Sequence, residues 1–288
     1  EVLRFRAVKG YDYNVFKDIT LKINELLQFN STDFYQPCIV SNPESYNRNH
    51  MDYKNYKIFK ESKGFEMKSI LSCAIVVDGD FYGIINLDNL EDPNAFTEND
   101  KPIIKHLSAQ IGIALKNTML IERILYLSRH DSLTGVYNQG YYEELLTKAY
   151  YQCKSDGNEL TIVMFDLNDL KQTNDTYGHE AGDLMLKKFV RGVQGNLAPD
   201  DVFARLGGDE FAAFFINKSK NEVEKIIQKI KTDLNNSPFT YCGKVVGVIT
   251  FGYGFAVFPT DALDLYELLK IADREMYNDK KRTKNLYD

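Results

Sequence analysis

A long run of helical periodicity in the middle of the chain most constrains how it can fold. Apolar side chains recur from Ile104 to Leu125 in alternating steps of three and four residues, which is the heptad rhythm of a helix with one buried seam. Thr97 and Asp100 resemble a capping box, so we expect a helix from Thr97 to about Arg129. At 288 residues the chain is long enough for two domains that each bury a core.

The seam of this helix has two interpretations. In one, the first half of the helix packs on its own domain and the second half is a linker. In the other, a parallel coiled coil holds two copies of the chain together. The seam positions are Ile104, Leu107, Ile111, Ala114, Thr118, Ile121 and Leu125, of which Thr118 is the weakest for a coiled coil.

The segment before the helix has the pattern of a sheet. Residues 2–8 and 70–90 are rich in branched and aromatic side chains, and Asp78-Gly79 supplies the tight turn of a hairpin within the second stretch. Residues 30–63 are polar and rich in Asn and Tyr, which indicates loops and short helices over one face of that sheet.

The segment after the helix mixes strands with helices. Residues 162–167 form a short apolar run that suits a strand buried on both faces. Further strands are expected at 211–216 and 245–258, and helices at 184–197, 221–234 and 263–281. This order predicts an α/β (α+β) domain.

Composition excludes several classes of protein. The chain is 44% hydrophobic and 26% charged, with a net charge of −6, which is a globular profile without the basic face of a nucleic-acid binder. It contains no apolar run of the ~18 residues that span a bilayer, so we expect a cytoplasmic protein. The cysteines are scattered and are expected to be buried, reduced side chains: Cys38, Cys73, Cys153 and Cys242.

Three acidic residues, at two places in the chain, carry the chemistry. Asp209 and Glu210 follow two glycines at the start of an apolar strand, and Asp166 lies at the end of the buried strand. Converging carboxylates hold hard cations such as Mg²⁺, and a pair of such ions serves nucleotidyl transfer. Two simpler interpretations stay open from spacing alone, in which the glycine turn is a solvated hairpin and Asp166 caps a strand.

Four ordered motifs in the second half carry a resemblance to a known family. They are Asp131-Ser-Leu-Thr-Gly-Val-Tyr-Asn-Gln, Phe165-Asp-Leu-Asn-Asp-Leu-Lys, Arg205-Leu-Gly-Gly-Asp-Glu-Phe and Ala272-Asp-Arg-Glu-Met-Tyr-Asn-Asp-Lys. Residues 131–288 resemble the GGDEF family of bacterial diguanylate cyclases, which condense two GTP into cyclic di-GMP. The resemblance implies a palm-like, mostly antiparallel sheet flanked by helices.

The resemblance also implies roles for individual residues. Asp166, Asp209 and the main-chain carbonyl of Leu167 hold two Mg²⁺ ions, with Mn²⁺ as an alternative. Asp209 helps to deprotonate the ribose 3′-hydroxyl, and Glu210 and Lys171 complete the catalytic set. Asn174 and Asp183 read the guanine edge and argue against an enzyme that also uses ATP. The expected substrate-binding residues are Asn174, Asp183, His179, Gly207, Gly208, Lys280 and Lys284.

Several positions depart from the family pattern. Asn168 replaces a second carboxylate, Gln139 replaces an arginine, and Thr283-Lys284 replaces a Gly-Arg pair. Family members with product inhibition carry an Arg-x-x-Asp motif, of which this chain keeps Asp201 but has Ala198 in place of the arginine. We therefore expect the usual inhibitory site to be broken.

The first half resembles a GAF domain more loosely, through the strand that begins at Leu3, the hairpin at 69–88 and the helix start after Phe96. We expect an N-terminally incomplete GAF sensory domain at 1–116, a signalling helix at 117–130 and the GGDEF domain at 131–288. The resulting hypothesis is a homodimeric diguanylate cyclase, joined through the helix and regulated by an unknown small molecule at the GAF domain. The alternative is a catalytically silent GGDEF module that binds GTP or cyclic di-GMP.

Overall fold

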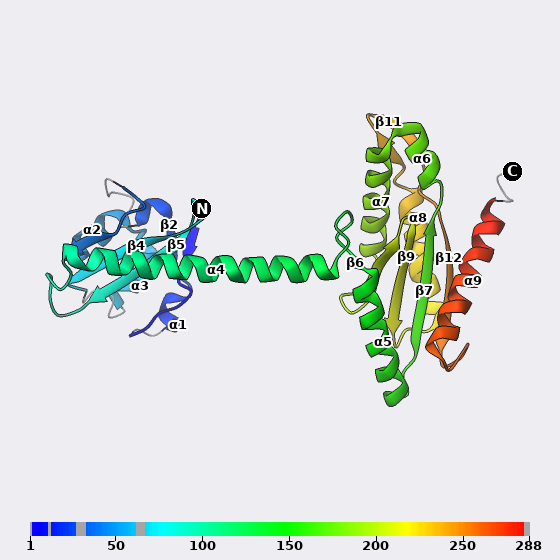
Figure 1. Cartoon of the computed structure of the whole chain (residues 1–288), viewed down its shortest axis with the longest axis horizontal. Coiled ribbons are helices and arrows are strands. Elements are labelled where there is room, and N and C mark those ends of the chain that lie inside the picture. Colours follow the sequence, from blue (N-terminus) through cyan, green and yellow to red (C-terminus); the bar gives the residue numbers. More distant parts are fainter. Residues whose placement is uncertain (1, 11–12, 27–32, 62–66, 285–288) are drawn as a thin grey trace. The chain divides into compact units, whose positions relative to one another are not determined.

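The computed structural model describes residues 2–10, 13–26, 33–61 and 67–284. The chain divides into two compact units, residues 1–122 and 123–288, and each is described by itself (Figure 1).

The first unit is built on an antiparallel sheet in the order β3-β4-β5. The predicted hairpin is confirmed, because β4 and β5 pair along their length and both turn residues, Asp78 and Gly79, have the positive φ that a tight hairpin requires. The polar segment 30–63 contains a strand that was not predicted, β3, as well as short helices. The elements are β1 (Val2–Arg4), α1 (Tyr13–Phe16), β2 (Thr20–Lys22), η1 (Ile23–Glu25), β3 (Cys38–Ser41), α2 (Glu44–His50), α3 (Tyr53–Glu61), β4 (Ser69–Val77) and β5 (Asp80–Asn89).

The predicted long helix is confirmed as α4 (Lys101–Arg129), which follows the short helix η4 (Glu98–Asp100) and the expected capping box. Its first turns pack on the sheet of the first unit. Ile104 is 0% exposed, Ser108 donates a hydrogen bond to the carbonyl of Ala74, and a Cβ at Gly112 would lie 2.8 Å from the Val76 carbonyl oxygen. The seam prediction is therefore wrong at Ile104, which lies inside its own domain.

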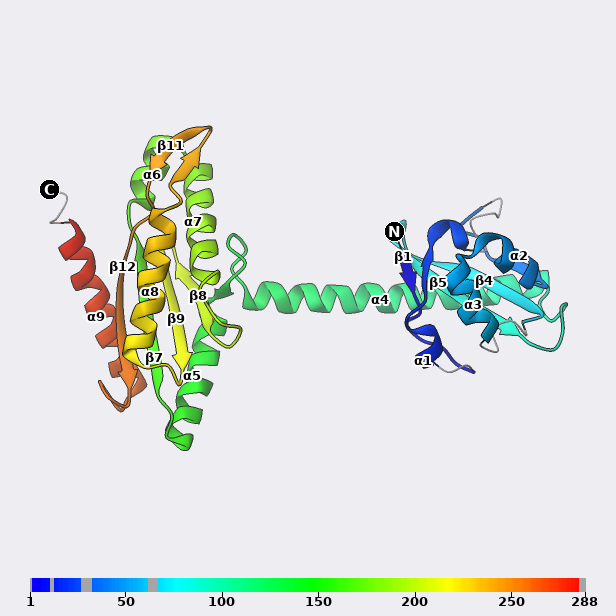
Figure 2. The same ribbon diagram turned by 180° about the vertical axis from the view of Figure 1, so that it is seen from behind.

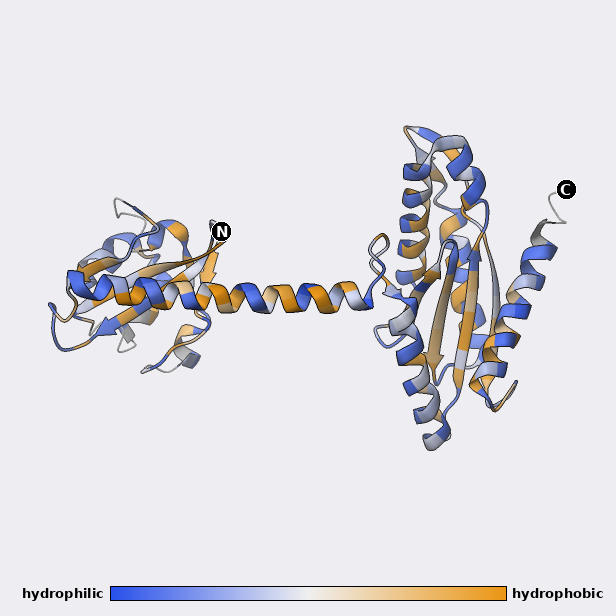
Figure 3. Ribbon diagram, viewed as in Figure 1, coloured by the Kyte–Doolittle hydropathy of each residue, from blue (hydrophilic) through white to orange (hydrophobic). Residues whose placement is uncertain are grey.

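Further along α4, large apolar side chains are exposed, among them Ile113, Met119, Ile121, Ile124 and Leu125. In Figure 3, hydrophobic and hydrophilic segments alternate along the ribbon of this helix. In the part of the chain that the structure describes, no helix combines the length and apolarity needed to cross a membrane.

The second unit has a five-stranded sheet in the order β12-β7-β9-β8-β6. All neighbours are antiparallel except β6 and β8, so the predicted mostly antiparallel sheet is confirmed. The predicted strand 245–258 is two strands, of which the first belongs to a separate hairpin, β10-β11. The strands are β6 (Tyr137–Asn138), β7 (Leu160–Leu167), β8 (Val202–Gly207), β9 (Glu210–Ile216), β10 (Phe239–Tyr241), β11 (Lys244–Gly247) and β12 (Phe251–Phe258).

Helices cover both faces of this sheet (Figures 1 and 2). Side chains alternate along β7, so Phe165 joins the core under α7 and α8, whereas Ile162 joins the core under α5 and α9. By the same alternation, Asp166 belongs to the face that α5 and α9 cover. The helices are α5 (Gln139–Asp156), α6 (Leu170–Tyr177), α7 (His179–Gln194), α8 (Lys220–Asn235) and α9 (Leu265–Lys284).

The four cysteines are free, as expected. Cys73 and Cys153 are buried and Cys38 is half-buried. Cys242 is exposed, so the prediction of burial is wrong there, because this residue lies in the turn between β10 and β11 with a φ of 47°.

Candidate active site

The three acidic residues predicted from the sequence meet at one end of the sheet. Asp166 lies directly opposite Glu210 in the antiparallel register of β7 and β9. Asp209 precedes Glu210 in the turn from β8, and its carbonyl accepts a 2.9 Å hydrogen bond from the amide of Leu167. The backbone ladder thus holds the two expected metal-binding segments side by side.

The glycine turn leaves open space beside these carboxylates. Gly208 has a φ of +49°, a left-handed conformation that glycine adopts without strain. A Cβ placed on Gly207 or Gly208 would meet no atom within 4 Å. The two glycines therefore form the turn and leave the space in front of it open, so that a ligand could approach the backbone.

A lysine from the far end of the chain contacts the acidic cluster. The Lys280 ammonium lies 2.5 Å from Oδ1 of Asp166. Burial raises the pKa of Glu210, and the charges of Asp166, Asp209 and Asp273 raise it further, while Lys280 lowers it. Negative charge is therefore in excess at this end of the sheet.

The donor set of the cluster suits a hard divalent cation. The carboxylates of Asp166 and Asp209 and the carbonyl of Leu167 are oxygen ligands of the kind that Mg²⁺ prefers, and Mg²⁺ needs few protein ligands when phosphate and water supply the others. Among the described residues, no group of three or more His, Cys, Asp or Glu side chains is arranged to hold a metal ion. A metal site here would therefore have to be built from two carboxylates and the main chain, with phosphate and water as the other ligands.

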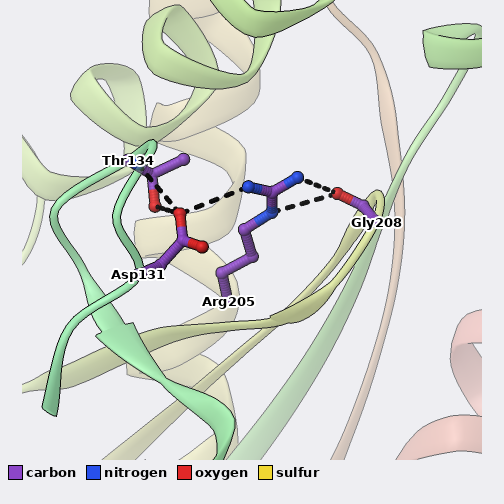
Figure 4. A network of polar contacts seen from close by, with 4 residues as sticks. All are labelled: Asp131, Thr134, Arg205 and Gly208. Atoms are coloured by element: carbon purple, nitrogen blue, oxygen red, sulfur yellow. Dashed lines mark hydrogen bonds and ion pairs between the residues drawn. The ribbon is translucent and has the colours of Figure 1, made fainter. Parts of the chain in front are cut away.

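The glycine turn is held by a network that the sequence interpretation did not assign (Figure 4). Arg205 donates from Nε and Nη2 to the carbonyl of Gly208, at 3.1 and 2.7 Å. Its Nη1 lies 3.2 Å from Oδ1 of Asp131, and the same oxygen accepts hydrogen bonds from the amide and hydroxyl of Thr134. The guanidinium thus fastens the residue before Asp209 to the loop that follows α4.

The pKa of Asp131 favours the charged carboxylate that the ion pair with Arg205 requires. Burial acts to raise the pKa of its carboxyl, but the Thr134 hydrogen bonds and the Arg205 guanidinium outweigh burial and hold the pKa below its ordinary value. Asp131 and Arg205 both lie in the motifs that resemble the GGDEF family. The sequence did show a charged side chain, Arg205, beside the glycine turn. Its partner Asp131 lies too far away in sequence to be identified from a local pattern.

The expected guanine-reading residues lie on α6 and α7. Asn174 packs against α7 so closely that a Cβ at Gly182 would lie 1.9 Å from its Oδ1. Asp183 follows Gly182 and is exposed. Lys171 and His179 are exposed near the starts of α6 and α7, and no described contact brings them to the acidic cluster. Lys284 is the last residue of α9, and its side chain lies outside the described part of the structure.

Asn168, which replaces the family's second carboxylate, is buried beside the cluster. Its amide N–H donates to the Thr250 carbonyl at 3.0 Å, and its Nδ2 lies 3.1 Å from the Thr250 hydroxyl. Its Oδ1 is buried with no partner among the described residues. Thr250, which precedes β12, was not predicted to matter for this site.

The remnant of the inhibitory motif lies at the other end of β8. Asp201 accepts hydrogen bonds from the Lys218 ammonium, at 2.6 Å to each oxygen, and from the amide of Ala198 at 2.8 Å. Its side chain is 3% exposed. This aspartate is satisfied within its own fold.

Comparison with family models decides the identity of the second unit. Residues 128–286 match the model described as diguanylate cyclase, GGDEF domain. The chain belongs to the GGDEF family. Residues 33–115 match the GAF domain model, so the GGDEF domain follows a GAF domain in this chain.

Relatives of this GGDEF protein have been named as cyclases and as phosphodiesterases. Diguanylate cyclase A of Treponema denticola is 28% identical over 201 residues, which are 69% of this chain and 53% of that protein. Cyclic di-GMP phosphodiesterase PdeR of Escherichia coli is 33% identical over 159 residues, 55% of this chain and 23% of that protein. The chain spans about half the length, or less, of these curated relatives.

Solved structures share the fold. The coiled coil and GGDEF domain of DgcB from Caulobacter crescentus, in complex with c-di-GMP, has a TM-score of 0.56 at 22% identity and covers 62% of this chain and 94% of that chain. The FimX GGDEF domain of Pseudomonas aeruginosa has a TM-score of 0.51 at 21% identity, with 54% and 96% covered. At these identities the likeness establishes the GGDEF fold.

Proposed function

We propose that this protein is a diguanylate cyclase that condenses two GTP molecules into cyclic di-GMP and two pyrophosphates. The observation that carries the proposal is the convergence of Asp166, Asp209 and Glu210, with Lys280, beside an open glycine turn. Excess negative charge at a rigid sheet end is suited to cations that accompany a triphosphate.

The reaction forms two identical phosphodiester bonds. In each, the 3′-oxygen of one GTP attacks the α-phosphorus of the other, the bond to pyrophosphate breaks, and the hydroxyl proton is lost with the help of the Asp209 carboxylate. Asp166, Asp209 and the Leu167 carbonyl would hold two Mg²⁺ or Mn²⁺ ions. When bound, these ions supply charge stabilisation at the attacking and leaving oxygens.

The remaining predicted residues would bind and select the nucleotide. Asn174 and Asp183 would pair with the guanine edge, whose N–H donors need acceptors that adenine does not. Lysine ammonium groups are compact charges suited to phosphate, and Lys171, Lys280 and Lys284 would serve in that way. His179, at the start of α7, would add a further contact to the substrate.

A catalytically silent module is the second candidate, because some relatives of this chain are named phosphodiesterases rather than cyclases. Such a module would bind GTP or cyclic di-GMP and signal to a partner. The presence of Asp166, Asp209 and Glu210 in one cluster favours the cyclase, since each is an acidic group that a mere receptor does not need.

Activity would require two copies of the chain. One GGDEF domain binds one GTP, so two domains must meet before a 3′-hydroxyl faces a second α-phosphate. The exposed apolar positions of α4 beyond Gly112 suit a parallel helix pair that raises the effective concentration of the second domain to about the millimolar range. A small molecule bound by the GAF domain would then control how the helices pair, in a bacterial cytoplasm.

The test of the dimer is Ile121→Asp with Leu125→Asp. We expect a monomer by light scattering, with a lower rate per chain at low protein concentration that recovers as concentration rises. The matched control is Asn117→Asp, which adds an acidic residue at an exposed position of the same helix outside the seam. Full activity from a monomer would refute the dimer.

The test of the function itself is incubation of the purified chain with GTP and Mg²⁺, followed by identification of the product by mass. Cyclic di-GMP is expected from the native protein and not from Asp209→Ala. Binding of GTP or cyclic di-GMP without turnover would instead support the silent module.

A further inference from the structure

Two glycines bring α9 into direct contact with β12. A Cβ at Gly254 would lie 2.1 Å from the amide nitrogen of Met276 and 2.3 Å from the carbonyl oxygen of Ala272. A Cβ at Gly252 would lie 3.2 Å from Cβ of Lys280. Any side chain at Gly254 would collide with helix backbone, so these glycines serve close approach.

This close approach is what delivers Lys280 to the acidic cluster. Gly252 lies opposite Asp166 in the register of β12 and β7. A helix that rests on Gly252 can therefore extend a lysine over β12 to the neighbouring strand, where its ammonium reaches Oδ1 of Asp166. The contact follows from the sheet register and the packing of α9.

The ion pair uses the same carboxylate that is expected to hold a metal. The side chains of Asp166 and Lys280 are 12% and 26% exposed, so solvent screens their attraction only in part. An oxygen that accepts an ammonium proton at this distance cannot also take Mg²⁺ at about 2.1 Å without bringing two cations together. A metal ion on the other oxygen, Oδ2, would still lie beside the ammonium and be repelled by it, so the two cations compete for this carboxylate.

Lys280 is able to leave this carboxylate. Its flexible four-carbon stem carries a point charge with freely rotating donors, and the residue lies near the C-terminal end of α9. An incoming triphosphate would offer the ammonium a new anionic partner at the moment when a metal ion occupies Asp166.

We propose that Lys280 is a displaceable cation, which occupies Asp166 in the nucleotide-free protein and transfers to the triphosphate when metal and nucleotide arrive together. The first half of this proposal rests on the ion pair alone, and the second half rests on the proposed function. Metal binds weakly without nucleotide and tightly with it, and by thermodynamic reciprocity metal strengthens nucleotide binding by the same factor.

The experiment titrates Mn²⁺ into the full chain without nucleotide and follows free Mn²⁺ by electron paramagnetic resonance. Lys280→Met removes the charge and keeps a similar stem, and should bind Mn²⁺ about tenfold more tightly than the native protein. Lys281→Met is the matched control, since it makes the same change of net charge one residue along α9, where the ammonium lies over the Tyr277 ring. This control should behave like the native protein, and Asp166→Asn added to Lys280→Met should abolish the gain.

A second titration includes GTP with a methylene group between its α- and β-phosphates, which cannot release pyrophosphate. Once the Mn²⁺ that the nucleotide binds in a protein-free control is subtracted, the native protein should bind Mn²⁺ at least about tenfold more tightly than without nucleotide, and Lys280→Met should bind it no more tightly than the native protein. Equal or weaker Mn²⁺ binding by Lys280→Met in the first titration, or an equal gain in Lys281→Met, overturns the proposal. The first titration involves no turnover, so its result stands even if the protein makes no cyclic di-GMP.

Discussion

The two ends of β8 each carry an aspartate, and the two environments are opposite. At the start of β8, Asp201 is almost wholly buried and accepts bonds from one ammonium and one amide. At its other end, Asp209 lies in a cluster with Asp166, Glu210 and Asp273. Among the described contacts of this cluster, Lys280 is the one positive charge.

The difference separates a carboxylate neutralised within its own fold from one that is left with an excess of negative charge around it. A buried carboxylate that is paired with an ammonium and an amide of its own domain helps to fix the local fold, and removing either partner would be costly. An excess of like charge at a rigid sheet end is unfavourable by itself and is relieved by added cations. The resemblance assigned Asp209 to the catalytic site and predicted that the inhibitory site at Asp201 is broken, and the partners of Asp201 agree with a role in the local fold.

The largest expected effect is at the acidic end. Asp166→Ala and Asp209→Ala should each lower cyclic di-GMP synthesis by at least about 10³-fold, because a bound metal ion supplies several kcal/mol of transition-state stabilisation. Circular dichroism should show an intact fold in both variants. Normal turnover in either variant would show that the acidic cluster at the end of β8 is not needed for catalysis.

A second prediction sharpens the comparison at α6 and α7, the helices proposed to select the nucleotide. Gly182→Ala should push aside the side-chain amide of Asn174 and, because Gly182 is buried, should cost about 1 kcal/mol of stability. Discrimination between GTP and ATP, expected to be roughly 10⁴-fold, should fall by about 10²-fold, since a base-reading acceptor is displaced.

The control for this change is Gly192→Ala on the same helix, whose Cβ would lie 2.7 Å from the buried Leu234 side chain. It should lower the melting temperature and leave the GTP preference intact. Unchanged selectivity in Gly182→Ala, measured by competition between the two nucleotides, would remove Asn174 from the proposed base-reading site.

A third prediction concerns the network that holds the glycine turn. Arg205→Lys keeps the charge but cannot hold Gly208 and Asp131 together, so kcat should fall about tenfold with little change in KM. Arg191→Lys, at an exposed position of α7, is the control. If Asp131→Asn and Arg205→Lys have fully additive effects on kcat, the two residues do not act as a unit.

The same pair has a signature in the pH dependence of stability. Because the folded-state pKa of Asp131 is lowered, its contribution is present above the unfolded-state value and is lost as pH falls through the folded-state value. Urea titrations of native protein and Asp131→Asn should therefore converge as the solution is acidified below about pH 4.

The smallest effect on turnover is expected at the start of β8. Asp201→Ala leaves the Lys218 ammonium without its partner and should cost about 2 kcal/mol of folding free energy, with kcat nearly unchanged. Added cyclic di-GMP should change the rate of the native protein by less than about twofold, below the usual range of allosteric coupling. Strong inhibition that Asp201→Ala removes would show that this end of β8 is also a ligand site.

The sequence by itself determined the features that depend on neighbours in the chain. The long helix, its capping box and the Asp78-Gly79 hairpin follow from local periodicity and turn chemistry, and all three are present. The motifs around Asp166 and Asp209 were likewise enough to indicate an acidic cluster and a family, because each motif is a short, ordered set of residues.

Only the tertiary structure decided which distant residues meet. Lys280 contacts Asp166 across 114 positions and Arg205 contacts Asp131 across 74, and both pairs depend on strand order and register rather than on local pattern. The inward orientation of Ile104 was decided in the same way, by packing of α4 on its own sheet. Periodicity says which side chains share a face of a helix, whereas the surface that covers this face is set by the rest of the fold.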